Sequence, residues 1–223
     1  MRIIASVAIS IDGCLDDSSP KRLILSSPED LEEVRKIRSE CDAILVGAET
    51  IRKDNPSLVT SDRKFIERRK KEGRCADPIK VTITKSGHLP LDSNFFKKGK
   101  CPKIVYCSNS IPREKEKKLQ EVATVVKLKN KIIASRQIVA DLKRRGVRSL
   151  LIEGGNEILT MFFADNLVNE FRLAIAPFLV GEKNAPRLLH SGIFPFNRNR
   201  QMKLESVKRL GDTAVMRYTL FKR

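Results

Sequence analysis

The sequence has no tryptophan, only two tyrosines and only two histidines, and its five cysteines include no Cys-x-x-Cys pair. Because single strands of nucleic acid are commonly bound by stacking on aromatic side chains, the shortage of aromatics disfavours that class of protein. Two isolated histidines, His88 and His190, disfavour a zinc site of ordinary ligand spacing, so no metal is expected. The odd number and wide spacing of the cysteines predict free, buried or half-buried thiols in a reducing cytosol.

Long apolar runs are also missing. No run approaches the roughly eighteen residues that a membrane-spanning helix needs. Residues 1–7 enter strand-like sequence directly, without the layout of a signal peptide. The sequence therefore predicts a cytoplasmic protein with no membrane partner. It shows no internal repeat, linker or domain boundary, so we expect one domain over residues 1–223.

Positive charge is abundant, because 44 Lys and Arg against 27 Asp and Glu give a formal net charge of +17. A nucleic-acid partner would explain this charge through phosphate neutralisation. The basic residues are spread along the chain and interleaved with acids, however, and attraction for small phosphorylated ligands explains the same composition. A nucleic-acid-binding module stays open as a disfavoured alternative.

The stretch Ser149–Leu159 has the most informative pattern. A short apolar run stops at Glu153 and Gly154-Gly155, and apolar residues then return at helical spacing. This pattern predicts a buried strand, a tight glycine turn and a helix with Asn156 as N-cap. Glycines at a helix start let an anion approach the backbone where the helix carries partial positive charge. The alternative is a turn that only reverses the chain.

A second strand–glycine–helix turn covers residues 42–56. Asp42–Val46 is predicted as a buried strand, and the short helix after Gly47 stops at Asn55-Pro56. Thr50 and Asp54 are four residues apart, so they face the same way on that helix. Polar residues also follow the first predicted strand, residues 3–11. There Ser10 and Asp12 occupy the strand end where open α/β sheets hold ligands, although Asp-Gly is also an ordinary turn signal.

The rest of the sequence predicts repeated β–α units followed by an antiparallel hairpin near the C-terminal end. A helix with Ser27 as cap and Pro28 in its first turn carries Arg38, which either covers apolar surface or reaches a ligand phosphate. Residues 63–74 are predicted as a solvated loop or helix. The other expected elements are strands at 79–83, 103–107, 122–128 and 170–176, helices at 112–121 and 135–145, a loop over 179–190, and a hairpin of 203–208 with 214–221.

Taken in order, these motifs resemble the riboflavin-biosynthesis reductase family, which includes the C-terminal half of the bacterial bifunctional deaminase–reductase. The resemblance spans nearly the whole chain. The zinc signature of the deaminase half, His-x-Glu with Pro-Cys-x-x-Cys, is absent, so the chain is similar to the free-standing archaeal and fungal type. The matching positions are Ser10–Gly13, Ser27-Pro28, Arg38, Gly47–Ile51, Asp54–Leu58, Glu153–Gly155, Ala176-Pro177, Gly181 and Ala185-Pro186.

The resemblance implies an α/β, dihydrofolate reductase-like fold with a mainly parallel central sheet flanked by helices and a C-terminal antiparallel hairpin. It also implies an NAD(P)H-dependent oxidoreductase that reduces the ribosyl group of 2,5-diamino-6-(ribosylamino)-4(3H)-pyrimidinone 5′-phosphate to the ribitylamino product. NADPH is the expected donor and NADH stays open, as does prior deamination of the pyrimidine. The family is dimeric, which implies a homodimer. The alternative is a related reductase acting on another pyrimidine or pteridine.

The resemblance further implies roles for single residues. Contacts to the cofactor are implied for Thr50, Asp54, Lys85, Ser86, Gly154, Gly155, Asn156 and Glu157. Contacts to the substrate are implied for Ser10, Arg38, Leu58 and Glu153. Bacterial members carry an arginine where this chain has Ser61, and Arg63 is the candidate replacement at the substrate phosphate.

Two carboxylates at strand ends are candidates for relaying the proton of the reduction, Glu153 and Asp12. For each, the alternative is hydrogen bonding to the pyrimidine or turn formation without proton transfer. We expect the two glycine turns to contact one bound dinucleotide, with Thr50 and Gly155 in a shared cleft.

Overall fold

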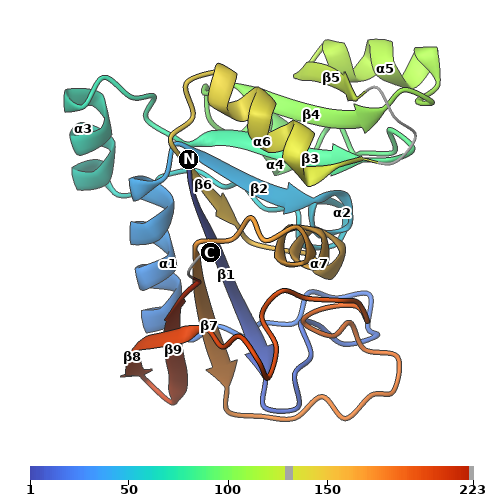
Figure 1. Ribbon diagram of the computed structural model, residues 1–223. Helices are drawn as coiled ribbons and strands as arrows, with labels where there is room; N and C mark the ends of the chain where they lie inside the picture. Colours follow the sequence, from blue (N-terminus) through green and yellow to red (C-terminus); the bar gives the residue numbers. More distant parts are fainter. Residues whose placement is uncertain (129–132, 221–223) are drawn as a thin grey trace. The chain divides into compact units, whose positions relative to one another are not determined.

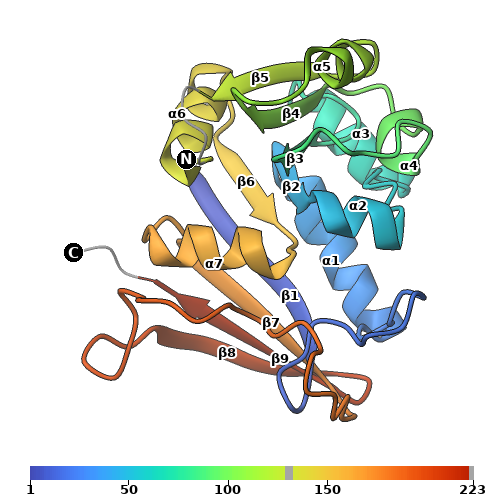
Figure 2. The ribbon, with the colours of Figure 1, turned by 90° about the vertical axis from the view of Figure 1, so that its right-hand side faces the viewer.

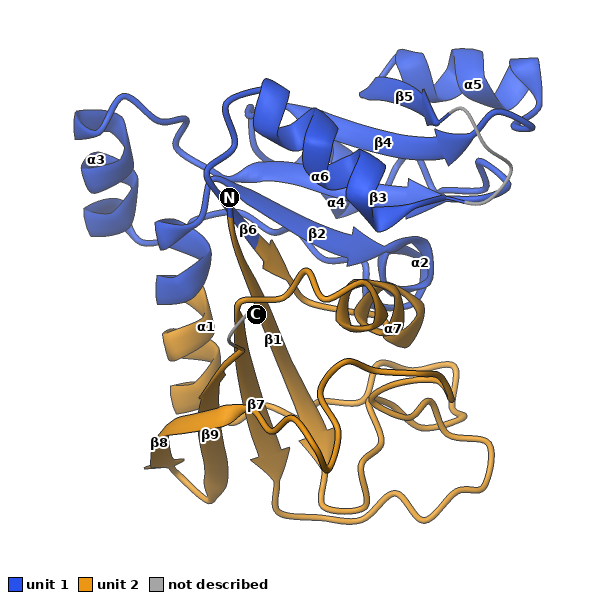
Figure 3. Ribbon diagram, in the orientation of Figure 1, with its two compact units in different colours: residues 1, 36–150 blue, residues 2–35, 151–223 orange. Residues whose placement is uncertain are grey.

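The computed structural model of the chain describes residues 1–128 and 133–220 (Figure 1). Its helices and mainly parallel strands, with an antiparallel pair at the end, confirm the predicted fold class. The chain divides into two compact units, one of residues 1 and 36–150 and the other of residues 2–35 and 151–223 (Figure 3). One domain over residues 1–223 stays a prediction. None of the described helices has the length and apolar character needed to cross a membrane.

The first unit contains four parallel strands in the order β5-β4-β3-β2 (Figure 2). Strands β2, β3 and β4 are almost wholly buried, as expected where both faces of a parallel sheet are covered. The strands are β2 (Ala43–Gly47), β3 (Ile79–Thr84), β4 (Lys103–Ser108) and β5 (Thr124–Leu128). The helices are α2 (Ala48–Asp54), α3 (Arg63–Lys71), α4 (Asn94–Lys97), α5 (Arg113–Gln120) and α6 (Ser135–Arg144).

In the second unit, β1 (Arg2–Ser10) runs parallel to β7 (Glu170–Ala176), and β7 pairs with the antiparallel hairpin of β9 (Thr213–Thr219) and β8 (Lys203–Leu210). This hairpin confirms the predicted one, although Phe221 lies outside the described residues. The unit also contains α7 (Asn156–Ala164) and residues 28–35 of α1 (Pro28–Glu40). The short strand β6 (Ser149–Ile152) lies where the two units divide.

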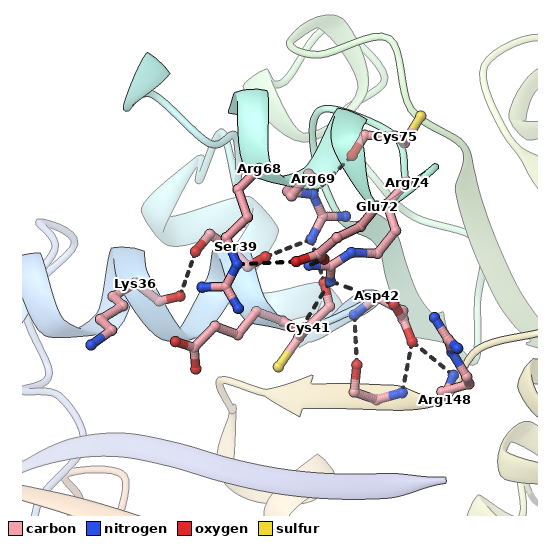
Figure 4. A network of polar contacts seen from close by, with 12 residues as sticks. Lys36, Ser39, Cys41, Asp42, Arg68, Arg69, Glu72, Arg74, Cys75 and Arg148 are labelled. Atoms are coloured by element: carbon pink, nitrogen blue, oxygen red, sulfur yellow. Dashed lines mark hydrogen bonds and ion pairs between the residues drawn. The ribbon is translucent and has the colours of Figure 1, made fainter. Parts of the chain in front are cut away.

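The prediction that residues 63–74 are solvated is wrong for Arg69. This segment forms α3, but the Arg69 side chain is buried beneath it (Figure 4). Its guanidinium donates to the carbonyl of Cys75 at 2.8 Å and to those of Ser39 and Cys41 at 2.9 and 2.6 Å. Helix ends leave backbone carbonyls without helical partners. Arg69 therefore caps the end of α1 and fastens α3 to it.

The prediction that all five cysteines are free thiols is also wrong. Cys75 and Cys101 form a disulfide, with Cα atoms 6.0 Å apart, whereas Cys14, Cys41 and Cys107 are buried thiols outside any disulfide. Cys75 precedes β3 and Cys101 precedes β4. Because these two strands pair in parallel, the segments that lead into them lie side by side. Sequence spacing cannot show this neighbourhood, because the partners are 26 residues apart.

Replacing Cys75 by Ser is expected to lower the free energy of unfolding by about 3.5 kcal/mol, because a cross-link over 26 residues restricts the unfolded chain. Denaturant unfolding of the oxidised wild type and of Cys75→Ser, each with and without a thiol reductant, measures the difference. The reductant should shift the wild type towards the variant and leave the variant unmoved. A wild type that is insensitive to the reductant would contradict the expectation.

Candidate active site

In the first unit, two strand ends and a short helix meet at one edge of the sheet. Gly47, the last residue of β2, pairs in register with Ile83 of β3, so α2 and the turn after β3 begin at the same edge. Arg52 of α2 donates to the carbonyl of His88 at 2.8 Å and ties the helix to that segment. The edge carries the four cofactor residues predicted in this unit, Thr50 and Asp54 on α2 and Lys85 and Ser86 in the turn.

The predicted substrate residues of this unit are spread over α1, α3 and the loop between α2 and α3. Leu58 is buried and has φ of +50°, a left-handed conformation that side-chain-bearing residues seldom adopt and that is often found at functional sites. Arg38 lies in the last turn of α1. Arg63 begins α3, is almost fully exposed and pairs with Glu67 at 2.8 Å. Such an exposed pair is worth little, so a ligand phosphate can compete for Arg63.

In the second unit, a glycine turn joins β6 to α7. Gly154 has φ of +108°, its peptide bond to Gly155 is cis, and a Cβ added at Gly154 would meet open space. The predicted N-cap at Asn156 is wrong by one residue, because the helix already begins there and the extended Gly155 takes the cap position. The Asn156 side chain instead accepts the N–H of Glu157 at 2.9 Å.

The start of α7 suits an anion. Gly155 offers no side chain to cap the helix, and although Asn156 accepts the Glu157 N–H, the helix start carries partial positive charge that attracts an anion. Glu153, which is half-buried, comes directly after β6, and β6 is next to β1 in the strand order. The turn therefore places the Glu153 carboxylate within three residues, along the chain, of a helix start that suits an anion.

Ser10 and Asp12 come together at the end of β1. The Ser10 hydroxyl donates to the Asp12 carboxylate at 2.5 Å, and this carboxylate also accepts the N–H groups of Gly181 at 2.8 Å and Val180 at 3.1 Å. These hydrogen bonds, that of Ser10 first, hold the pKa of Asp12 well below its usual range. At neutral pH, Asp12 is an acceptor without a proton to give. This geometry favours turn formation over proton transfer for Asp12.

The predicted site residues are thus divided between the units. The first unit holds Arg38, Thr50, Asp54, Leu58, Arg63, Lys85 and Ser86, and the second holds Ser10, Asp12, Glu153, Gly154, Gly155, Asn156 and Glu157. That Thr50 and Gly155 contact one dinucleotide stays a prediction. Sequence reasoning missed the contacts of Val180, Gly181 and Arg187 with the β1 turn, although Gly181 was among the positions that carry the resemblance.

Comparison with known proteins gives the family. The model of the RibD C-terminal domain family matches residues 1–216. The chain belongs to this family. Among curated members, the 2,5-diamino-6-ribosylamino-4(3H)-pyrimidinone 5′-phosphate reductase of Archaeoglobus fulgidus is 30% identical over 210 residues, 94% of both chains. The protein of that name from Methanothermobacter thermautotrophicus is 27% identical over 98% of this chain and 97% of its own.

Solved structures support the fold of the RibD C-terminal domain family. A pyrimidine reductase-like protein from Corynebacterium diphtheriae superposes with a TM-score of 0.81 at 22% identity, covering 100% of this chain and 92% of its own. The riboflavin biosynthesis reductase of Saccharomyces cerevisiae superposes with a TM-score of 0.70 at 18% identity, covering 99% and 90%. These similarities agree with the predicted reductase fold.

Proposed function

We propose that the chain is a nicotinamide-dependent reductase that converts the ribosyl group of 2,5-diamino-6-(ribosylamino)-4(3H)-pyrimidinone 5′-phosphate into a ribityl group. Relatives that carry this name align with it over most of both chains. The structural observation that carries the proposal is the glycine turn directly after Glu153, which leads into α7 with Gly155 at the cap position. It offers an anion site and a carboxylate within one short segment.

The residues present fit a dinucleotide. At Gly154 the absence of a side chain leaves open space beside the backbone, and the start of α7 offers N–H donors to a phosphate. Asn156 and Glu157 supply polar side chains at the same helix start. In the first unit, Thr50, Asp54, Lys85 and Ser86 supply further hydrogen-bonding groups. NADPH is the expected donor, with NADH as the alternative.

The chain's part in the reaction is positioning and proton delivery. When bound, the nicotinamide supplies a hydride. When the sugar's C1′–O4′ bond opens and C1′ becomes doubly bonded to the amino nitrogen, O4′ needs a proton, and C1′ is the carbon that would accept the hydride. We assign to Glu153 the delivery of one proton to O4′. Ser10, Arg38 and Leu58 hold the acceptor carbon in place, because hydride transfer requires the reacting atoms in contact.

We place the substrate phosphate at Arg63, because Ser61 cannot supply the cation that bacterial members carry there. The almost complete exposure of Arg63 and its weak pairing with Glu67 leave its donors available. The proposed assembly is a homodimer. Strand β8 is last in the strand order and exposes Leu204 and Val207, which makes it an edge where a second copy can pair.

The proposal is tested by mixing protein, NADPH and the ribosylaminopyrimidine phosphate and following nicotinamide absorbance. We expect NADPH consumption that depends on the pyrimidine. NADPH alone at 100 times its Kd should stabilise the fold by about 2.7 kcal/mol, seen as a higher Tm. Consumption with another pyrimidine or pteridine only would favour the alternative reductase. Neither stabilisation nor turnover, together with salt-sensitive binding of RNA, would favour the nucleic-acid module.

A further inference from the structure

The segment of residues 178–188 is fastened along its length to the turn that follows β1. Backbone hydrogen bonds join the two stretches at three points, Ile11 N–H to the Phe178 carbonyl at 2.9 Å, Leu15 N–H to the Pro186 carbonyl at 2.7 Å and Leu188 N–H to the Gly13 carbonyl at 3.2 Å. All of these residues lie in the second unit. The segment has no helix or strand of its own, so these contacts define its position.

The Asp12 carboxylate is the centre of this fastening. One of its oxygens accepts from the Ser10 hydroxyl and the Val180 N–H, and the other accepts from the Gly181 N–H. Gly181 has φ of +71°, a conformation that favours glycine. The guanidinium of Arg187 donates to the backbone carbonyl of Asp12 from the far end of the segment. The Cys14 thiol also approaches the carboxylate, at 3.8 Å.

An ionised carboxylate suits this position better than any other group of its size. It accepts three hydrogen bonds here and has no proton to place against a donor. An amide would keep one acceptor oxygen and turn an NH₂ group towards a backbone N–H or a hydroxyl. The position therefore requires a carboxylate that stays ionised, because its hydrogen bonds hold the segment. A group that exchanged a proton in each catalytic cycle would lose acceptor capacity whenever it was protonated and would hold the segment less tightly.

We propose that Asp12 is a positioning residue whose carboxylate fastens residues 178–188 beside Ser10 and so shapes the substrate site. This inference rests on the proposed function. The fastened stretches also present Ile11 and Leu179, two apolar side chains that are 61% and 67% exposed. They offer apolar contact to the flat pyrimidine ring of the substrate. Asp12 affects substrate binding by positioning this segment, whereas Glu153 delivers the proton to O4′.

The test is Asp12→Asn, with Asp212→Asn as control. Asp212 also lies in a tight turn of the second unit next to a glycine, but its side chain is 78% exposed and, among the described residues, it pairs with Arg209. In Asp12→Asn we expect amide hydrogen exchange of residues 178–188 to rise at least about tenfold and KM for the pyrimidine to rise about tenfold or more. We expect kcat to stay within about threefold and its pH profile to keep its shape. The control should leave exchange and KM unchanged.

A kcat that falls about 100-fold or more with unchanged KM and a lost limb of the pH profile would overturn the proposal and make Asp12 the proton donor. Unchanged exchange in residues 178–188 would also overturn it. Arg187→Met gives a second route, because it removes the guanidinium that donates to the Asp12 backbone carbonyl and leaves the carboxylate in place. It should raise exchange and KM in the same direction, and the double variant should show less than the product of the two effects. A wild type inactive on the pyrimidine refutes the proposed function, while the exchange measurement still decides the role of Asp12.

Discussion

Replacing Glu153 by Gln is expected to lower kcat by about 100-fold or more while leaving the Kd of NADPH within about twofold. The amide keeps the size of the side chain and its capacity to hydrogen-bond, but it cannot deliver a proton to O4′. Cofactor affinity should survive, because the backbone of Gly154 and Gly155 and the start of α7 are unchanged. Turnover and NADPH binding are measured separately, by steady-state kinetics and by calorimetry.

The matched control is Glu170→Gln, which removes the same charge at the start of β7 in the second unit. Glu170 forms a surface pair with Arg2 and has no place in the proposed site. Its kcat should stay at the wild-type value. If Glu153→Gln also kept wild-type turnover, Glu153 would lose the role of proton donor and would keep only the alternative of hydrogen bonding to the pyrimidine.

The largest effect on stability is expected from Arg172→Met. The Arg172 side chain is 2% exposed, pairs with the fully buried Asp30, and donates to Glu33 at 2.7 and 3.0 Å. Removing one partner from a buried ion pair leaves a charge without compensation and costs about 3–5 kcal/mol. One oxygen of Asp30 already has no hydrogen-bond partner among the described residues, so nothing there replaces the arginine. Denaturant unfolding measures the loss.

The control is Arg209→Met, because Arg209 and Asp212 form an exposed pair three residues apart. Its free energy of unfolding should change by less than about 0.5 kcal/mol. A loss in Arg172→Met no greater than in this control would contradict the expectation and would mean that solvent or another cation compensates Asp30.

The same cluster should make the protein sensitive to acid. Partial burial pushes the pKa of Glu33 upward, but hydrogen bonding and attraction by Arg172, followed by Arg217, outweigh it and hold the pKa below the ordinary 4.5. A carboxyl with a lowered pKa contributes stability above its unfolded pKa and loses it as the pH falls through the folded value. The stability difference between wild type and Arg172→Met should therefore shrink below pH 4.5. A difference that stays constant at lower pH would contradict this cause.

Local chemistry allowed much of the fold to be predicted. Ser27 caps α1, its hydroxyl accepting the Asp30 N–H at 3.1 Å, and Gly146 follows α6 with φ of +82°, because both features depend on a few neighbouring residues. The buried arginines were beyond such reasoning. Arg172 meets Asp30 across 142 residues and Arg69 meets Ser39 across 30, and no local pattern distinguishes these side chains from surface arginines.

The same limit applies to the candidate site. The family resemblance named Thr50 and Ser86, and the register of β2 with β3 shows why they share one edge of the first unit. Strand-end logic found Asp12, but not its role, since Val180 and Gly181 lie 168 and 169 residues away. Only their convergence on the carboxylate shows that it is already engaged as an acceptor. The Asn156 prediction failed for a local reason, because the cap preference ranks Asn above Gly, whereas the helix begins at Asn156 and Gly155 takes the cap position.

The most direct test of the central claim is to run the reaction with NADPH deuterated at the transferring position of the nicotinamide and to locate the label by NMR and mass spectrometry. We expect a ribitylamino pyrimidine phosphate that carries one deuterium, bound to C1′. A product labelled on the pyrimidine ring, or label retained on the nicotinamide while the substrate is unchanged, would contradict the account.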